Sequence, residues 1–435
     1  MHRCDESLAL DKQLAKVIEE TTPDFSTVLK PGDTLIWGQA TSEPLTLTRA
    51  LTRQRQHLPR VRLMMGIDLS QTIRSEHHDA FDFAGYCGAG GMRQLAMAGL
   101  LDLYPLPYSQ LAREIHEGQC KADVVLVQVS SPNAQGQYSL GLSNDWLIPA
   151  LRSARAVIAE VNAEVPWTHG AISLNESDIT LKVAARHAPL EYSAKAPSDT
   201  EAKIAANVAR LIEDGATLQV GLGGVASRVF SLLKDRRDLG YHSGLAIDAL
   251  VDLAESGALT NARKTIDQGF SVAGILMGSR RLYDFASQNP RFQMRGSEYT
   301  HDAQVLRSID CFVAINSAIE VDLTGQVNAE VAAGNYVGAV GGAPDFLRGA
   351  QASKGGLPII ALPSTERSAS RIVATLSGPV STPRCDAGLI VTEYGVADLR
   401  GLPVRARVKR MIDIAAPAHR ESLELQSHQV LKRLA

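Results

Sequence analysis

The sequence has few cysteines, no long apolar run and no surplus of positive charge. Its five cysteines among 435 residues are scattered without a Cys-x-x-Cys pair, which excludes a disulfide framework and the usual zinc-site spacings. No stretch approaches 18 apolar residues, so no membrane-spanning helix is predicted. Lysine and arginine number 44 against 47 aspartates and glutamates, a net charge of -3. This balance gives no electrostatic reason to expect nucleic acid or an anionic membrane as a partner.

The amino terminus lacks the features of a secretion signal. Residues 1–13 carry charges but no apolar core, so we expect a protein of the cytoplasm. The histidines show no metal-ligand spacing, and the pair His77-His78 lies beside acidic residues in a segment typical of a solvated surface. We therefore expect no bound metal. We expect the cysteines, Cys4 among them, to be either buried thiols or surface thiols without a chemical role.

What is present is an alternation of short apolar runs with amphipathic stretches. Residues 34–37, 124–129 and 312–315 are typical of buried strands, whereas residues 45–51 and 201–212 are typical of helices. The composition, 45% hydrophobic and 21% charged, is that of an ordinary globular protein. The pattern predicts an α/β fold with largely parallel sheets.

The sequence contains an internal repeat. Residues 32–51 and 215–233 both read Gly-x-Thr-Leu, a strand, a glycine, a loop of small residues and a leucine-containing helix. A second pair of similar segments, residues 123–141 and 310–328, follows at a similar spacing in each half. We interpret the two pairs as two similar α/β domains. The alternative explanation is that α/β proteins in general share such an order of strands, glycine-containing turns and helices.

We predict the boundary between these domains near residue 190. The stretch 187–196 is polar and contains a proline, which is typical of a linker. The predicted domains are residues 1–190 and residues 191–435.

Two glycine-rich loops are candidate anion-binding sites. Residues 221–225 follow a strand and precede an amphipathic helix, so backbone N–H groups at the helix start can meet an anionic ligand. This loop matches neither GxGxxG nor a P-loop, and tight-turn packing is the alternative. The second loop, residues 338–346, leads to Lys354, which could reach a phosphate or lie free at the surface.

These motifs resemble those of the class I coenzyme A transferases, in particular the acetyl-CoA hydrolase / 4-hydroxybutyrate CoA-transferase family. The resemblance covers nearly the whole chain and includes VSSPNAQGQYSLG at residues 129–141, NSAIEVDLTGQVNAE at 316–330 and IVTEYGVADLRG at 390–401. It implies two similar open α/β domains with the active site between them. It also implies that coenzyme A (CoA) or acyl-CoA binds as a substrate, mainly to the second half, with no permanent cofactor. The family's CoA contacts fall on Gly221, Leu222, Gly223, Gly224, Val225, Gly338, Gly342 and Lys354.

The sequence departs from this family at the catalytic nucleophile. Family members attack the acyl-CoA thioester with a glutamate that follows His-Ser or His-Thr, and they pass through an acyl-glutamyl anhydride and a glutamyl-CoA thioester. This chain reads His242-Ser243-Gly244. Glycine has no side chain to acylate, so the usual covalent route has no residue at its usual position.

Three explanations are open. Another carboxylate takes the role, with Glu43 as the first candidate because it lies in the loop after the first strand, and with Asp68 and Glu76 as others. An ordinary acid at a helix start is the alternative for Glu43. In the second explanation, an incoming carboxylate or water attacks directly beside an open space at Gly244. In the third, the chain binds CoA without turnover.

The resemblance implies an acyl-CoA:carboxylate CoA-transferase acting on small carboxylic acids. An acyl-CoA hydrolase and a catalytically inert CoA- or acyl-CoA-binding protein are the alternatives. Arg93, Arg367 or Arg371 could pair a second carboxylate of the substrate, although structural ion pairs would explain each equally well. The family also implies a homo-oligomer, a dimer or higher.

Overall fold

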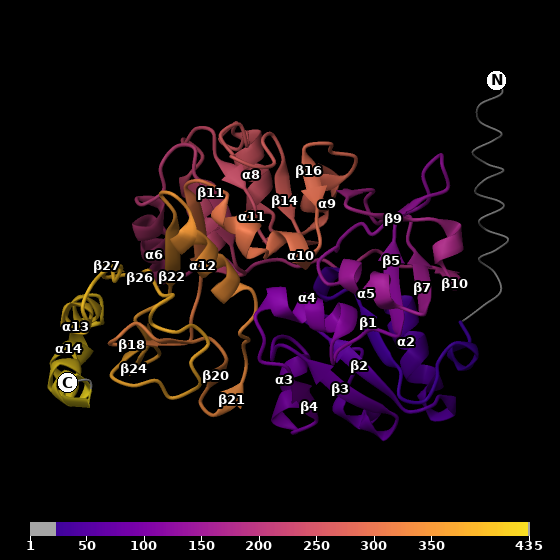
Figure 1. The fold of residues 1–435 in the computed structure, drawn as a ribbon, viewed down its shortest axis with the longest axis horizontal. Helices are drawn as coiled ribbons and strands as arrows, with labels where there is room; N and C mark the ends of the chain where they lie inside the picture. Colours follow the sequence, from indigo (N-terminus) through magenta and orange to yellow (C-terminus); the bar gives the residue numbers. More distant parts are fainter. Residues whose placement is uncertain (1–22, 434–435) are drawn as a thin grey trace.

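Two α/β units lie side by side along the long axis of the molecule in this computed structural model, which describes residues 23–433 (Figure 1). The first half of the chain forms one unit and the second half the other, with the helices α13 (Val404–Asp413) and α14 (Pro417–Arg433) at the far end of the second. The predicted α/β class with largely parallel sheets is confirmed. The expectations for residues 1–13 and Cys4 lie outside the described residues.

The first half is built around a seven-stranded sheet that is parallel throughout, in the order β10-β7-β5-β1-β2-β3-β4. β5 and β7 are buried at every position, as expected for central parallel strands covered on both faces. The strands are β1 (Thr34–Trp37), β2 (Val61–Met65), β3 (Phe81–Gly85), β4 (Leu101–Leu103), β5 (Val124–Val129), β7 (Ala156–Val161) and β10 (Leu181–Ala184), and the helices are α2 (Leu45–Gln54), α3 (Met92–Met97), α4 (Tyr108–Glu117) and α5 (Leu147–Ser153).

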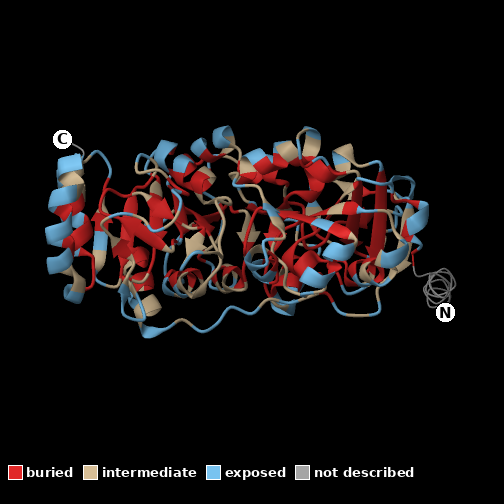
Figure 2. Ribbon diagram, turned by 90° about the horizontal axis from the view of Figure 1, so that it is seen from below, coloured by how far each residue is buried: buried red, intermediate tan, exposed pale blue. Residues whose placement is uncertain are grey.

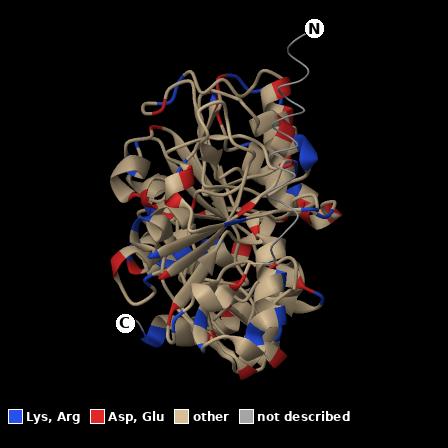
Figure 3. Cartoon of the chain, turned by 90° about the vertical axis from the view of Figure 1, so that its right-hand side faces the viewer, with Lys and Arg blue, Asp and Glu red and all other residues tan. Residues whose placement is uncertain are grey.

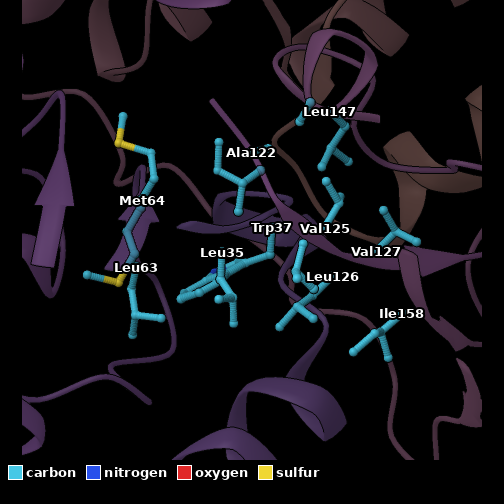
Figure 4. Close-up of a cluster of buried hydrophobic side chains, with 14 of the residues drawn as sticks. Leu35, Trp37, Leu63, Met64, Ala122, Val125, Leu126, Val127, Leu147 and Ile158 are labelled. Atoms are coloured by element: carbon cyan, nitrogen blue, oxygen red, sulfur yellow. The ribbon is translucent and has the colours of Figure 1, made fainter. Parts of the chain in front are cut away.

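Apolar side chains from these strands and from α5 form the core of this half (Figure 4). Leu35 of β1, Leu63 of β2 and Val125 of β5 are fully buried. Leu35 and Leu63 lie on one face of the sheet and Val125 on the other, where Leu147 of α5 packs. Burying such a side chain contributes about 1.5–3 kcal/mol. Strands as short as β1, with four residues, therefore owe their stability to this packing rather than to local propensity.

The second half contains a six-stranded sheet in the order β12-β11-β17-β22-β26-β27. All its pairings are parallel except that of β27 with β26. The strands are β11 (Thr217–Val220), β12 (Gly240–Tyr241), β17 (Phe312–Asn316), β22 (Leu357–Ala361), β26 (Leu389–Thr392) and β27 (Gly395–Asp398), and the helices are α6 (Asp199–Ala209), α7 (Gly224–Leu232), α8 (Ala249–Glu255), α9 (Arg280–Ala286), α10 (Ser297–Thr300), α11 (Ala303–Arg307) and α12 (Ala343–Ala352).

Shorter elements surround the two main sheets. They are η1 (Phe25–Thr27), η2 (Ala40–Ser42), η3 (Arg55–His57), η4 (Ser75–Asp79), η5 (Glu176–Asp178), β6 (Tyr138–Ser139), β8 (His169–Gly170), β9 (Ser173–Leu174), β13 (Leu245–Ala246), β14 (Ser271–Ala273), β15 (Ile275–Leu276), β16 (Phe292–Met294), β18 (Glu320–Asp322), β19 (Val327–Asn328), β20 (Val331–Ala332), β21 (Asn335–Tyr336), β23 (Thr365–Glu366), β24 (Ala369–Ser370) and β25 (Ile372–Val373).

The internal repeat has a counterpart in the topology. β1 and β11, from the first pair of similar segments, each lie parallel to the strand from the second pair, β5 or β17. The order β7-β5-β1-β2 in the first sheet matches the order β22-β17-β11-β12 in the second. The similar segments of sequence therefore fall on strands with equivalent neighbours.

The two halves are joined by a segment without helix or strand between β10 and α6, which contains the predicted boundary at residue 190. β8 precedes this boundary yet pairs with β16 of the second half. A division at residue 190 stays a prediction.

Burial and charge follow the same two-unit plan. The central strands of both units are buried, whereas the edge strands β4 and β10 are partly exposed and the outer faces of the helices are exposed (Figure 2). Lysines and arginines are interspersed with aspartates and glutamates over the outer elements (Figure 3). Of the helices between residues 23 and 433, none is long and apolar enough to cross a membrane.

Candidate active site

A cavity of about 520 Å³ lies between the two halves. Gln39, Tyr108 and Asp145 line it from the first half, and the loops after β11 and β17 line it from the second. Ligands of open α/β sheets bind at the carboxyl ends of the strands, where these loops lie. The cavity is therefore the natural place for the active site of this fold.

The cavity brings together the two glycine-rich loops. Gly221 and Leu222 line it after β11, and Gly338 and Gly342 line it before α12. Gly223, Gly224 and Val225 continue from the first loop into the start of α7. Lys354 is exposed beyond the carboxyl end of α12 and does not line this cavity.

Close approach of backbone and ring atoms requires glycine at two of these positions. A Cβ atom on Gly338 would lie 1.9 Å from the carbonyl oxygen of Ala329, and one on Gly342 would lie 2.6 Å from Nε2 of His301. No side chain fits at either distance without a shift of its neighbours.

The first half holds the second glycine-rich loop in place. Gly88 N–H donates to the Gly338 carbonyl at 2.8 Å, and Tyr108 N–H donates to the Gly341 carbonyl at 3.1 Å. Ser109 binds Asp345, in the first turn of α12, through its N–H at 3.0 Å and its hydroxyl at 2.7 Å. Burial raises the pKa of Asp345 to about 6. The loop is thus tied across the domain interface.

Asp145 is a buried carboxylate in the cavity wall that the sequence reasoning missed. It accepts hydrogen bonds from Ser143 Oγ at 2.7 Å, Gln39 Nε2 at 2.7 Å and Tyr108 Oη at 2.9 Å. Burial raises its pKa, whereas these donors oppose the rise. The available signal was its position, four residues after the recognised motif at 129–141.

Gly244 lines the cavity, but the open space expected beside it is not there. A Cβ atom on Gly244 would lie 2.9 Å from Cε1 and 3.0 Å from Nε2 of His301, and 3.5 Å from Cζ of Phe346. The imidazole ring of His301 therefore fills the space over the glycine. This corrects the expectation, because the sequence places His301 fifty-seven positions away and gives no sign of the contact.

His301 follows α10 and is almost completely buried. Its ring packs between Tyr108 and Phe346, with centroids 4.9 and 4.5 Å away. Burial lowers the pKa of His301 to about 3, so its side chain is neutral at physiological pH. A neutral imidazole ring therefore lies over Gly244, where the sequence predicts the position of the missing glutamate.

The His-Ser pair that precedes Gly244 has structural contacts. His242 is fully buried, with Nε2 3.1 Å from the Thr300 carbonyl, and Ser243 Oγ donates to the Val220 carbonyl at 3.2 Å. Burial lowers the pKa of His242 to about 3. Both side chains hold in place the short segment between β12 and β13, which contains Gly244.

Glu43 lies outside the main cavity. It lines a separate cavity of about 10 Å³ with Asp68, and Gln39 and Ile67 contribute to the walls of both. Thr48 Oγ1 donates to its carboxyl group at 2.8 Å. Burial, followed by the charge of Asp68, raises the pKa of Glu43 to about 7. The nucleophilic role of Glu43 stays a prediction, and its location does not favour it.

The other predicted nucleophiles and the predicted carboxylate-binding arginines do not line the main cavity either. Glu76 is exposed on η4, and neither it nor Asp68 lines the main cavity. Arg93 and Arg367 are exposed, and Arg371 pairs with Glu366. Among the described residues that line the cavity, none is a lysine or an arginine.

Comparisons with known proteins agree with this geometry. Residues 1–198 match the acetyl-CoA hydrolase/transferase N-terminal domain, and residues 278–427 match the corresponding C-terminal domain. The 4-hydroxybutyrate coenzyme A transferase of Clostridium kluyveri is 37% identical over 89% of this chain and 92% of its own length. The chain belongs to the acetyl-CoA hydrolase/transferase family.

Further members of this family match over most of the chain. The butyryl-CoA:acetate CoA-transferase of Anaerostipes caccae is 32% identical over 95% of this chain and 97% of its own. The crystal structure of RipA from Yersinia pestis is 32% identical, has a TM-score of 0.90 and covers 96% of this chain and 98% of its own. The resemblance and the enzyme class inferred from the sequence, a CoA-transferase, are confirmed.

Proposed function

We propose that the protein moves CoA between small carboxylic acids as an acyl-CoA:carboxylate CoA-transferase, with Gly244 in the position of the usual glutamate. The observation that carries this proposal is the cavity itself. It joins both glycine-rich loops to the wall of the first half, and the position of the family nucleophile lies within it. A substrate acid and a thioester can meet there without a carboxylate from the chain.

The proposed route is direct transfer in a ternary complex. A carboxylate oxygen of the acceptor acid attacks the thioester carbonyl carbon, the C–S bond breaks, and a mixed anhydride and CoA thiolate result. The thiolate then attacks the acceptor's carbonyl carbon in the anhydride, and the first acid leaves as a carboxylate. No proton is gained or lost. Holding both reactants in one cavity replaces the gain that covalent catalysis would give.

The glycine-rich loops are the proposed CoA contacts. Backbone N–H groups around Gly221 to Val225 and around Gly338 and Gly342 can stabilise the thioester oxygen as it becomes an oxyanion. Lys354, outside the cavity, would meet a phosphate of the nucleotide part of CoA where that part extends to the surface.

The cavity favours acids with one carboxylate and an apolar remainder. Among residues 23–433, no lysine or arginine lines it, whereas Leu245, Ile275, Met277 and Phe346 supply apolar surface. A second carboxylate would lose its hydration there without an opposite charge. The names of the two relatives, for 4-hydroxybutyrate and for butyryl-CoA with acetate, belong to the same class of short acids. A cytoplasmic location and a homo-oligomeric state stay predictions.

A mass-spectrometric exchange assay tests the proposed function. Butyryl-CoA is mixed with the protein and with acetate, propionate or succinate, and free CoA is followed in parallel. New acyl-CoA with little free CoA is the expected result, stronger for acetate and propionate than for succinate. Free CoA without exchange would make the protein a hydrolase, and no product at all would favour a binding protein.

A trapping experiment distinguishes direct transfer from a displaced nucleophile. Borohydride reduces a glutamyl-CoA thioester, and peptide mapping then locates the modified residue. We expect no modified residue in a protein that exchanges acyl groups. A modification at Glu43 would establish the covalent alternative.

A further inference from the structure

The cavity wall holds one polar side-chain nitrogen that the proposed reaction has not used, Nε2 of His301. The tyrosine and amide donors of the cavity bond within the wall: Tyr86 Oη donates to Gln39, Tyr108 Oη and Gln39 Nε2 donate to Asp145, and the amides of Gln219 and Asn316 bind each other. Nε2 of His301 has no hydrogen-bond partner among residues 23–433, although the ring lines the cavity. It is therefore available to a ligand.

Thr300 is the hydrogen-bond partner of Nδ1, and two arrangements of the protons fit its contacts. Thr300 Oγ1 lies 2.9 Å from His301 Nδ1 and 3.3 Å from the Gly296 carbonyl. The hydroxyl donates either to that carbonyl, with Nδ1–H as the donor to Oγ1, or to Nδ1 itself. In the second arrangement the neutral imidazole carries its proton on Nε2, and a carboxylate bound at Nε2 selects that tautomer.

We propose that the Nε2–H group of His301 binds the carboxylate of the acceptor acid, beside Gly244. This proposal rests on the transfer reaction proposed above. Nε2 lies 3.0 Å from the ideal Cβ position of Gly244, where the side chain of a glutamate would begin. A carboxylate hydrogen-bonded to Nε2 takes the place of the missing side chain's carboxylate. The substrate thereby supplies the oxygen nucleophile that the chain lacks.

The geometry also fixes the donor. The ring is held between Tyr108 and Phe346, and glycine at 244 and at 342 leaves room for it on the two sides that its Nε2 end approaches. A donor fixed before the substrate arrives loses little freedom on binding. A hydrogen bond to a charged oxygen is among the stronger ones, so one neutral donor in an apolar cavity can select a monocarboxylate.

Calorimetry of butyrate binding to the CoA-saturated protein tests this site. We expect His301→Leu to weaken butyrate binding about tenfold or more, and His301→Gln, which retains an N–H at similar reach, to recover most of the loss. CoA affinity, measured separately, should be unchanged in both variants. His78→Leu, on exposed η4, is the matched control and should bind both ligands like the wild type.

Each other outcome counts against the site. Butyrate binding that is absent in the wild type, unchanged in His301→Leu, or lost equally in His301→Gln overturns it, as does a parallel loss of CoA affinity. The exchange assay is read independently. Binding that depends on His301 in a wild-type protein that exchanges nothing would refute the transfer reaction but not the site.

Discussion

At the residue scale, the decisive feature is the contact between Gly244 and His301. The ring occupies the space that a side chain at 244 would need, whereas Phe346 would meet a Cβ there only in ordinary van der Waals contact. The ring is itself packed against Tyr108 and Phe346, so it cannot move aside at little cost. Glycine at 244, the predicted nucleophile position, therefore fits the ring of His301, which leaves little room for a side chain there.

Gly244→Glu should accordingly destabilise the protein. Overpacking of this kind costs about 1–3 kcal/mol, which calorimetric unfolding would record as a lower Tm. Gly221→Ala is the matched control, because a Cβ there has no contact closer than 3.9 Å and should leave Tm nearly unchanged. Removing the ring in Gly244→Glu/His301→Ala should recover stability. A Gly244→Glu protein that is as stable as the wild type would contradict the predicted clash with His301.

Glu43→Gln should change the pH dependence of stability without abolishing exchange. The pKa of Glu43 in the folded protein, about 7, lies above the ordinary glutamate value of 4.5, so the folded state holds the proton more tightly. Stability from this group is fully present below pH 4.5 and is lost as the pH rises through 7, about 3 kcal/mol in all. The variant should lack this decline.

Urea unfolding of wild type and Glu43→Gln at pH 5, 6, 7 and 8 measures the difference. Glu117→Gln, at an exposed position, serves as control and should follow the wild type. Parallel curves for wild type and Glu43→Gln would contradict the raised pKa. Loss of acyl exchange in Glu43→Gln with stability retained would instead support Glu43 as the nucleophile.

At the scale of elements, α12 and the loop before it connect the two halves at the cavity. Tyr108 and Ser109 at the start of α4 bind Gly341 and Asp345 at the start of α12. The same loop supplies Gly338 and Gly342 to the cavity wall. Its position, and with it the proposed binding of CoA, depends on a helix of the other half.

Asp345→Ala should raise KM for acyl-CoA about fivefold and change kcat less. The variant loses two hydrogen bonds, each worth about 1 kcal/mol, at the base of the loop. Steady-state kinetics measures both constants. Asp386→Ala is the control, because it removes the partner of Arg348 on the same helix without touching the loop. Equal effects of the two substitutions would show that α12 acts through its general stability alone.

At the scale of the whole molecule, the two units share structure across the predicted boundary. β8 pairs with β16, and the Asn144 and Ser297 N–H groups donate to the carbonyls of Gly274 and Asp145, at 2.8 Å each. The active-site cavity needs residues from both sides. Each unit has its own sheet, but the site exists only when they are assembled.

Residues 1–190 and 191–435, produced together as two chains, should therefore assemble and bind CoA. The break falls in a segment without helix or strand, so no sheet is interrupted. Co-purification through a tag on one chain, followed by calorimetry with CoA, tests this. A break after residue 126, within β5, is the control and should prevent assembly. Fragments that fold but elute separately would contradict a shared interface.

The sequence by itself determined the fold class, the repeat and the glycine-rich loops. These features follow from short-range sequence patterns: the periodicity of strands, apolar runs such as residues 124–129, and glycines such as 338 and 342. Such patterns can be recognised from neighbouring residues in the sequence alone. The sequence also predicts that Gly244 stands at the position of the family's glutamate.

Only the tertiary structure decided what surrounds Gly244. His301 reaches it because the end of α10 lies against the segment after β12, where His242 Nε2 is 3.1 Å from the Thr300 carbonyl. Glu43 lines a separate cavity, with Gln39 and Ile67 in the walls of both. Asp145 meets Gln39, which is 106 positions away in the sequence. Such contacts join segments far apart in sequence, and their geometry depends on the packing of whole elements, which no local pattern encodes.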